Sequence, residues 1–161
     1  MDSLIIIGRA ERVSFPSMEL FNIPVKIDTG ADASSIWCSK VEVVNDGLNC
    51  IFFGPQSKHY NGKPYHFKKD EVSLTRVANS FGQKEYRYKV KIPMKLKGKT
   101  IKATFTISDR SQKLYPVLIG RSTLRGKFLV DVRNGRPLRD EEKLRAAKMR
   151  QEITELKKGK K

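Results

Sequence analysis

Residues 84–107 alternate charged and apolar side chains along the chain, and this period of two predicts β-strands. The positive side chains share one face, which we call the basic comb: Arg87, Lys89, Lys91, Lys95, Lys97 and Lys99. Apolar side chains between Tyr88 and Leu96 share the opposite face. Lys97-Gly98-Lys99 predicts a tight turn that joins the two extended segments. The stretch therefore predicts a half-buried meander with one basic face.

Turn residues and apolar runs divide the rest of the body into further strands. They are expected over residues 2–15, with a bend near Gly8, and over 21–30, 34–46, 116–119 and 127–132. Asn45-Asp46-Gly47 is a hairpin signal, and a short helical turn is expected after Gly120-Arg121. Residues 54–70 are rich in Gly, Pro, Lys and aromatic side chains, which predicts a surface loop or an irregular edge.

The composition changes at Arg139. From there Glu, Lys, Arg, Ala and Leu favour a helix with only a thin apolar stripe. The last Lys-rich residues, 157–161, are expected to be disordered. We therefore predict a mainly β fold in one compact domain over residues 1–138, followed by a basic helical or disordered tail over residues 139–161.

The net charge of +16 lies mostly in the predicted domain, because residues 139–161 hold nine Lys/Arg against five Asp/Glu. A positive body attracts anions, so the partner classes to weigh are nucleic acid, an acidic membrane surface and an acidic peptide. A basic, solvated surface with no dedicated partner is the alternative.

The sequence predicts neither a membrane anchor nor a disulfide framework. The apolar run from Leu4 to Ile7 is too short for a signal peptide core or a membrane span. Cys38 and Cys50 are too few for a disulfide framework and match no zinc pattern. We expect free thiols, buried or partly buried, in a reducing compartment, and hence a cytoplasmic protein.

An apolar segment, residues 23–27, ends on a carboxylate in the stretch KIDTGADASS. Asp28 and the small residues around it fit an ordinary Asx-type turn. They also fit a carboxylate held at a strand end to work on a substrate. A lone Asp-Thr-Gly is weak support for the second interpretation.

Two further stretches of sequence strengthen the second interpretation, in which Asp28 works on a substrate. The ordered phrases IDTGA, SFGQKEYRYKV and ISDRSQKLYPVLIGRSTL together resemble the retropepsin-like aspartic proteases, single-lobe dimeric relatives of pepsin, over roughly residues 20–131. Within that superfamily the chain is most similar to a bacterial group found alongside ATP-grasp peptide ligases and historically labelled ATP-dependent zinc proteases. The resemblance implies a retropepsin-like closed β-barrel with a flap hairpin and a short helix after Gly120-Arg121.

The resemblance also implies a homodimer, because the chain has one Asp-Thr-Gly and the chemistry needs two carboxylates. Such a pair shares one proton, so it can activate a water and protonate the leaving amine. The implied catalytic residues are Asp28, Thr29, which braces the pair across the two-fold axis, and Gly30, which permits close backbone approach. The implied substrate-binding residues lie in the same loop, in a flap around residues 76–86 and on its arm: Ala31, Asp32, Ser80, Phe81, Gly82, Arg87 and Lys89.

Retroviral members pair the Asp four positions after the catalytic one with the Arg of the Gly-Arg motif, here Asp32 and Arg121. We expect a buried or half-buried ion pair that locks the active-site loop to the following helix. Removing one partner of a buried pair would cost about 3–5 kcal/mol. The bacterial group often has Arg where this chain has Asp32, so the chain departs from its nearer relatives there, and substrate choice at that position stays open.

No cofactor and no metal are expected. His59 and His66 lie in a predicted loop and the chain has no HExxH, so the zinc label finds no support in the sequence. The stretch GRSTLRGK does not match a P-loop, because Phe128 occupies the place of the magnesium-binding hydroxyl. Any ATP dependence would belong to a partner ligase.

The basic comb favours an acidic substrate, because long-range attraction raises the local concentration of a negative peptide. Ligases of the associated kind add glutamate or other amino acids to protein tails, so the leading hypothesis is a protease that trims acidic, glutamate-rich tails. The alternative is a non-catalytic basic β-domain that binds RNA or a ribosomal or acidic protein surface. Its base-stacking candidates interleave with lysines: Phe52, Phe53, Tyr60, Tyr65 and Phe67. Aromatic residues at this density are more often core, so we favour the protease hypothesis.

Overall fold

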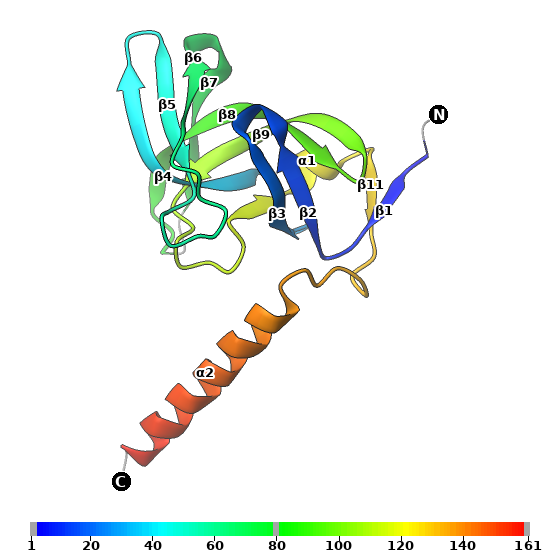
Figure 1. The fold of residues 1–161 in the computed structure, drawn as a ribbon, viewed down its shortest axis with the longest axis vertical. Coiled ribbons are helices and arrows are strands. Elements are labelled where there is room, and N and C mark those ends of the chain that lie inside the picture. The colour runs from blue at the N-terminus through cyan, green and yellow to red at the C-terminus, as the bar shows by residue number, and fades with distance from the viewer. Residues whose placement is uncertain (1–2, 79–80, 160–161) are drawn as a thin grey trace.

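The computed structural model describes residues 3–78 and 81–159, and within them it confirms a mainly β fold. Its elements in chain order are β1 (Ile5–Ile7), β2 (Ala10–Phe15), the 3-10 turn η1 (Pro16–Met18), β3 (Leu20–Ile27), β4 (Ser34–Val44), β5 (Gly47–Phe52), β6 (Pro64–Lys68), the 3-10 turn η2 (Lys69–Glu71), β7 (Val72–Ala78), β8 (Lys84–Leu96), β9 (Lys99–Ser108), β10 (Val117–Ile119), α1 (Arg121–Leu124), β11 (Phe128–Val130) and α2 (Arg139–Lys158). Figure 1 shows the strands gathered in one body, from which α2 projects.

The main sheet closes on itself into a near-barrel. Its strand order is β10-β3-β2-β8-β9-β4-β5-β6, and β10 also pairs with β4, which joins the two sides of the ring. β7 pairs with β8 outside this path, and β1 pairs with β11 in a separate parallel pair. Because β10 runs parallel to β3 and antiparallel to β4, it is the strand that closes the barrel.

The alternation along β8 determines which of its side chains are buried inside this ring. Val90, Ile92, Met94 and Leu96 are fully buried, whereas Lys91 and Lys95 between them are exposed. β8 continues through the predicted Lys97-Gly98-Lys99 turn into β9, with Leu96 opposite Lys99. Period-two burial against the neighbouring strands is what holds this pair in register.

For residues 54–70 the sequence predicted a surface loop or an irregular edge, and the second half forms an edge, as a regular strand. Residues 64–68 form β6, an edge strand that pairs antiparallel with β5. Phe67 is fully buried and packs edge-on against Phe52, with 6.1 Å between ring centroids. This aromatic contact comes from a neighbouring strand, and it stabilises extended backbone in a stretch whose Gly, Pro and Lys content favoured a loop.

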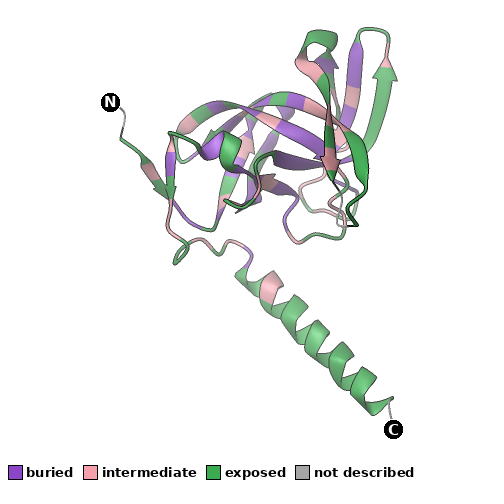
Figure 2. Ribbon diagram, turned by 180° about the vertical axis from the view of Figure 1, so that it is seen from behind, coloured by how far each residue is buried: buried purple, intermediate pink, exposed green. Residues whose placement is uncertain are grey.

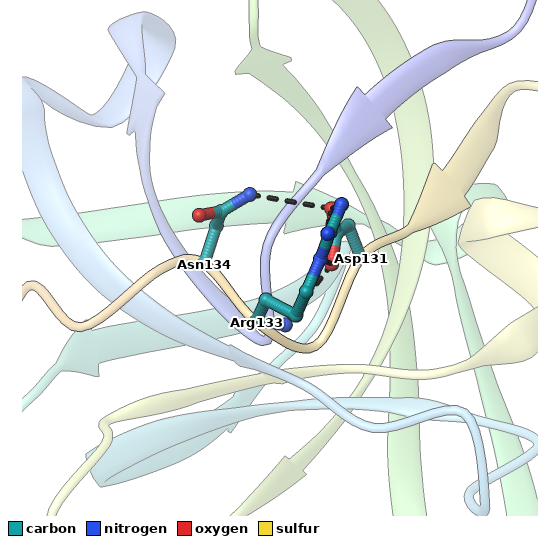
Figure 3. Close-up of polar contacts among 3 residues, drawn as sticks. All are labelled: Asp131, Arg133 and Asn134. Carbon is teal, nitrogen blue, oxygen red and sulfur yellow. Dashed lines mark hydrogen bonds and ion pairs between the residues drawn. The ribbon is translucent and has the colours of Figure 1, made fainter.

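After β11 the chain turns back toward the N-terminal segment through a polar turn. Asp131 accepts hydrogen bonds from Arg133 Nε and Nη2 and from Asn134 Nδ2 (Figure 3). Hydrogen bonding to Arg133 lowers the pKa of Asp131. On the main chain, the Asp131 N–H donates to Ile7 O at 2.8 Å and the Arg9 N–H to Asn134 O at 2.9 Å. The turn therefore fixes the end of β11 beside β1.

The C-terminal helix α2 contacts the body along its first two turns, where Arg145 Nη2 donates to Gln112 O at 2.8 Å. The Tyr115 hydroxyl donates to Glu142 at 3.3 Å, and Leu138, just before the helix, is buried. Figure 2 shows the rest of α2 exposed. Lys157 and Lys158, expected to be disordered, are helical instead, since positive side chains in the last turn favour a helix end; residues 160–161 lie outside the described part.

Hydrogen bonds of buried hydroxyl groups join α1 and the end of β10 to the start of β4. Ser34 Oγ lies 2.6 Å from Thr123 Oγ1 and accepts a hydrogen bond from the Gly120 N–H at 3.0 Å. Both hydroxyl residues are buried. A Cβ on Gly120 would lie 2.5 Å from the backbone oxygen of Ala33, so only glycine allows this approach. The loop before β4 and the start of α1 are thereby held together.

Replacing Thr123 by Val should keep the shape and remove one hydrogen-bond partner from the buried Ser34 hydroxyl. We expect the free energy of unfolding to fall by about 1–3 kcal/mol, because a buried polar group then lacks a partner. Urea unfolding followed by circular dichroism measures this, with Thr100→Val on the exposed side of β9 as the control. An equal change in both variants would contradict a structural role for the Ser34–Thr123 contact.

Candidate functional site

Asp28 follows directly after β3 and lies where β10 inserts beside it. Its N–H donates to Ile119 O at 2.8 Å, so the main-chain position is fixed by the last residue of β10. Its Oδ1 accepts a hydrogen bond from the Gly30 N–H at 3.0 Å. Oδ2 has no hydrogen bond or ion pair within residues 3–78 and 81–159. The residue is partly buried, so one carboxylate oxygen is held by the loop and the other is left without a protein hydrogen bond in the described part of the chain.

The Gly30 contact is the Asx-type turn that the sequence suggested, and it coexists with an accessible carboxylate. Thr29 and Gly30 are exposed, and Ala31 is partly buried. A Cβ on Gly30 would lie only 3.3 Å from Asp28 Oδ1. Thr29 uses its carbonyl oxygen to accept a hydrogen bond from Arg121 Nη1 at 3.0 Å, which leaves its side chain on the outer surface.

Asp32 and Arg121 are in contact, but the expected burial of the pair was wrong. Arg121 Nη2 lies 3.8 Å from Asp32 Oδ1, and the two side chains are 50% and 80% exposed. Water competes for both charges, so an exposed pair of this kind contributes at most about 1 kcal/mol. Instead, backbone bonds join the loop to α1: the Arg121 N–H donates to Ala31 O at 2.8 Å and the Ser122 N–H to Asp32 O at 3.0 Å.

β7 and β8 form the hairpin expected for a flap. Arg76 pairs with Tyr86, and Ala78 with Lys84 is the last pair of the hairpin. Phe81 is 86% exposed, and Gly82 has a φ of +76°, a conformation that glycine adopts easily. Ser80, named as a substrate-binding candidate, lies outside the described residues.

The two basic candidates on the flap arm are partly buried. Arg87 Nη2 lies 2.6 Å from Glu85 Oε1, so its charge is already partnered within the hairpin. Lys89 has no ion pair within the described part of the chain. The comb residues farther along, Lys91, Lys95 and Lys97, are exposed.

Arg110 is a partly buried basic residue that the sequence reasoning did not select as a site residue. It lies in the segment between β9 and β10, and its Nε donates to Tyr115 O at 3.0 Å. Burial lowers the pKa of Arg110, the positive charge of Arg87 acts in the same direction, and the negative charge of Asp28 opposes both. Only the presence of Arg110 in the matching phrase ISDRSQKLYPVLIGRSTL could have drawn attention to it.

Three further features raised by the sequence are the cysteines, a metal site and a membrane span. Cys38 and Cys50 are buried free thiols, and their mutual hydrogen bond lowers the pKa of Cys38 and raises that of Cys50. Among residues 3–78 and 81–159, no cluster of three or more His, Cys, Asp or Glu is arranged to hold a metal ion. In the same ranges, no helix combines the length and apolar character that a membrane crossing requires.

The aromatic residues weighed for base stacking are mostly core. Phe52, Phe53 and Phe67 are at most 3% exposed, and Phe53 lies 6.4 Å from the ring of Trp37. Tyr60 and Tyr65 are partly buried. Since the phenylalanine faces are covered by the protein, they are not available to stack on bases.

Known proteins resemble the chain over most of its length. Two bacterial proteins named "Probable alpha-L-glutamate ligase" are each 26% identical to it: one from Desulfotalea psychrophila over 78% of this chain, and one from Shewanella pealeana over 81%. The matches cover only 28% and 29% of those two proteins, so the chain spans less than a third of their length.

A solved structure shares the fold. The crystal structure of Lpg0085 from Legionella pneumophila, a protein of unknown function, superposes with a TM-score of 0.64 at 22% identity. The match covers 84% of this chain and 98% of that one. The family described as "Retropepsin-like aspartic endopeptidase RimB" matches residues 6–141, which hold Asp28, the β7–β8 hairpin and α1. The chain therefore belongs to the RimB-like family of retropepsin-like aspartic endopeptidases.

Proposed function

We propose that the protein is a homodimeric aspartic endopeptidase in which two copies each contribute Asp28 to one site. The observation that carries the proposal is the Asp28 carboxylate: fixed at a strand end, held through Oδ1 and accessible at Oδ2. The chain has a single Asp-Thr-Gly, so a carboxylate pair requires a second copy.

The chemistry follows from two carboxylates at close range. Two like charges cannot both ionise there, so the pair holds one proton. The ionised carboxylate takes a proton from water as its oxygen attacks the peptide carbonyl carbon, and the protonated one donates to the carbonyl oxygen. When the carbon–nitrogen bond breaks, the pair gives its proton to the departing nitrogen, and one hydroxyl of the tetrahedral intermediate returns a proton to the pair as the new carboxyl group forms. Thr29, beside Asp28 on the surface, would brace the two loops across the axis.

An apolar surface beside Thr29 supports the dimer. An open hollow of about 470 Å³ is lined by Thr29, Arg121, Leu124, Arg125, Phe128, Leu129 and Val130. Next to it Ile6 and Leu129, on adjacent strands β1 and β11, are 62% and 52% exposed. Contiguous exposed apolar side chains mark interaction surfaces, and a second copy placed here would bring Thr29 close to its counterpart.

The β7–β8 hairpin is the element suited to cover a bound peptide. It ends in the exposed Phe81 and Gly82, and its arm carries Arg87. Closure of such a hairpin would exclude water from the scissile bond and add backbone hydrogen bonds to the substrate.

For the substrate we infer an acidic, glutamate-rich peptide or protein tail. The basic comb provides long-range attraction, and relatives of this chain carry the name of a glutamate ligase, an enzyme class that would make such tails. A ligase of that kind is the partner we propose, as the source of the substrate. The RNA-binding alternative is less favoured, since Phe52, Phe53 and Phe67 are buried.

Asp28→Asn should abolish peptide hydrolysis while the fold persists, with a loss on the order of 10³-fold or more, because the amide can hold no shared proton. Turnover of oligo-glutamate and circular dichroism measure the two effects, and Asp46→Asn in the exposed β4–β5 turn is the matched control. Full activity of Asp28→Asn would rule out the proposed mechanism.

The same variant tests whether the site is shared. When wild type is equilibrated with an equal amount of Asp28→Asn, turnover per wild-type chain should fall to about half, because mixed dimers carry one carboxylate each. Unchanged turnover after subunit exchange would mean that one chain suffices.

Leu129→Lys should separate the dimer, because it introduces a charge into the apolar surface on β11. We expect a monomer by light scattering and loss of turnover at the same protein concentration. Val43→Lys, at another exposed apolar position, in the β4–β5 hairpin, is the control that should stay dimeric. Dissociation of both variants, or of neither, would contradict this interface.

Cleavage of oligo-glutamate should slow sharply as salt rises from ~50 to ~300 mM, because the Debye length is about 10 Å at 0.1 M and the exposed comb acts over longer distances. The measurement is kcat/KM across the salt series, with a neutral peptide as the control. Equal salt dependence for both peptides would count against electrostatic attraction of the substrate and leave the catalytic mechanism untouched.

A further inference from the structure

A cavity of about 350 Å³ lies at the opposite end of β10 from Asp28. Three segments that are far apart in the sequence line it: the loop after β5, the segment between β9 and β10, and the residues where α2 begins. Pro116, just before β10, belongs to the lining, whereas Asp28 bonds to Ile119 O at the end of that strand. Three residues of strand separate the two positions, which is about 10 Å. The cavity is therefore separate from the candidate peptidase site.

Much of the lining is apolar, from Trp37, Leu114, Pro116 and Leu138. Trp37 is firmly held, because its N–H donates to Pro116 O at 2.9 Å and its carbonyl oxygen accepts from the Phe53 N–H at 3.0 Å. A Cβ on Gly54 would lie 2.7 Å from the Trp37 ring, so the ring packs directly against this glycine. A preformed cavity of this size and character suits a small organic ligand.

His59 adds a polar group to the lining that the protein does not satisfy. Its Nε2 is buried and has no hydrogen-bond partner in residues 3–78 and 81–159. The loop holds the residue in place, since the His59 N–H donates to Ser57 Oγ at 3.2 Å and the Tyr60 N–H to Ser57 O at 3.1 Å. A buried nitrogen without a partner costs free energy, and a polar ligand in the cavity could recover that cost.

The charged residues of the lining are Lys58, Lys113 and Glu141. Lys58 Nζ lies 4.0 Å from Glu141 Oε1, whereas Lys113 has no ion pair in the described part of the chain. Burial and the positive charges of Lys58 and Arg12 lower the pKa of His59, so its imidazole is neutral at neutral pH. Two lysines against one glutamate leave a single positive charge, which one carboxylate would balance.

We propose that this cavity binds a small organic anion, a carboxylate joined to an aromatic or other apolar group. The apolar group would pack against Trp37 and Leu114, and the carboxylate would lie toward the exposed Lys58 and Lys113. Glu141 competes with the ligand for Lys58, so its carboxylate limits the affinity. The inference goes beyond the proposed peptidase function and does not depend on it.

The probe that tests the proposal is 3-phenylpropanoate, with the uncharged 3-phenylpropanamide as its counterpart. Trp37 is the one tryptophan of the chain, so a change in its fluorescence reports occupancy of the cavity. The carboxylate should bind ~5-fold or more tightly than the amide, the range of an exposed ionic contact. Titration calorimetry measures the same affinities. Neither fluorescence change nor heat with the carboxylate would overturn the proposal, as would equal affinity for the amide.

Lys113→Gln should weaken binding of the carboxylate by ~5-fold and leave binding of the amide unchanged. Lys102→Gln, an exposed lysine on β9 outside the lining, is the matched control and should bind as wild type does. Equal affinities of these two variants would contradict the contact with Lys113.

Glu141→Gln should have the opposite effect and tighten carboxylate binding by ~2- to 5-fold, because Lys58 is then shared with no other anion. Damage to the fold would not produce such a gain. Glu152→Gln, at an exposed position farther along α2, is the control. If Glu141→Gln binds no more tightly than this control, the proposed competition for Lys58 is wrong.

Asp28→Asn should bind 3-phenylpropanoate with wild-type affinity, because the cavity does not include Asp28. Weaker binding by that variant would assign the probe to the candidate peptidase site and overturn the proposal. A wild type that binds the probe in the cavity but hydrolyses no peptide would contradict the peptidase proposal alone.

Discussion

The candidate site depends on how β10 is held between β3 and β4. The Asp28 N–H donates to Ile119 O, and the buried Ser34 hydroxyl contacts Thr123 and accepts from the Gly120 N–H. These bonds join the loop that follows β3 to the turn that follows β10. Because they are buried and short, they hold the carboxylate more firmly than the exposed ion pair between Asp32 and Arg121 does.

In the proposed dimer, each chain would supply half of the site. Asp28 has an accessible carboxylate oxygen, Thr29 lies on the outside, and the apolar side chains Ile6 and Leu129 are exposed nearby. A fold that hydrolyses peptides by itself would have no need to expose these groups together. A two-fold symmetric dimer would account for all three features, because one contact between two copies would cover the apolar side chains and bring two Asp28 carboxylates together.

The positive side chains of the body differ in how firmly they are held. The comb residues Lys91, Lys95 and Lys97 are exposed, so their effect is long-ranged, screened by salt and indifferent to the shape of the anion. Arg110 is partly buried, and its Nε donates to Tyr115 O, so its position is fixed more firmly than those of the exposed lysines.

Short-range patterns in the sequence were enough to predict several elements. The alternation around Val90 predicted β8 and its buried face, and the order of Asp-Thr-Gly, flap and Gly-Arg blocks predicted the family. Features that depend on distant segments became visible only in the folded chain: Phe67 holds β6 as a strand, Asp32 and Arg121 stay exposed, and Ser34 bonds to Thr123. Period and turn chemistry are properties of a few neighbouring residues, whereas burial and charge proximity arise only when β10 closes the barrel and brings remote segments together.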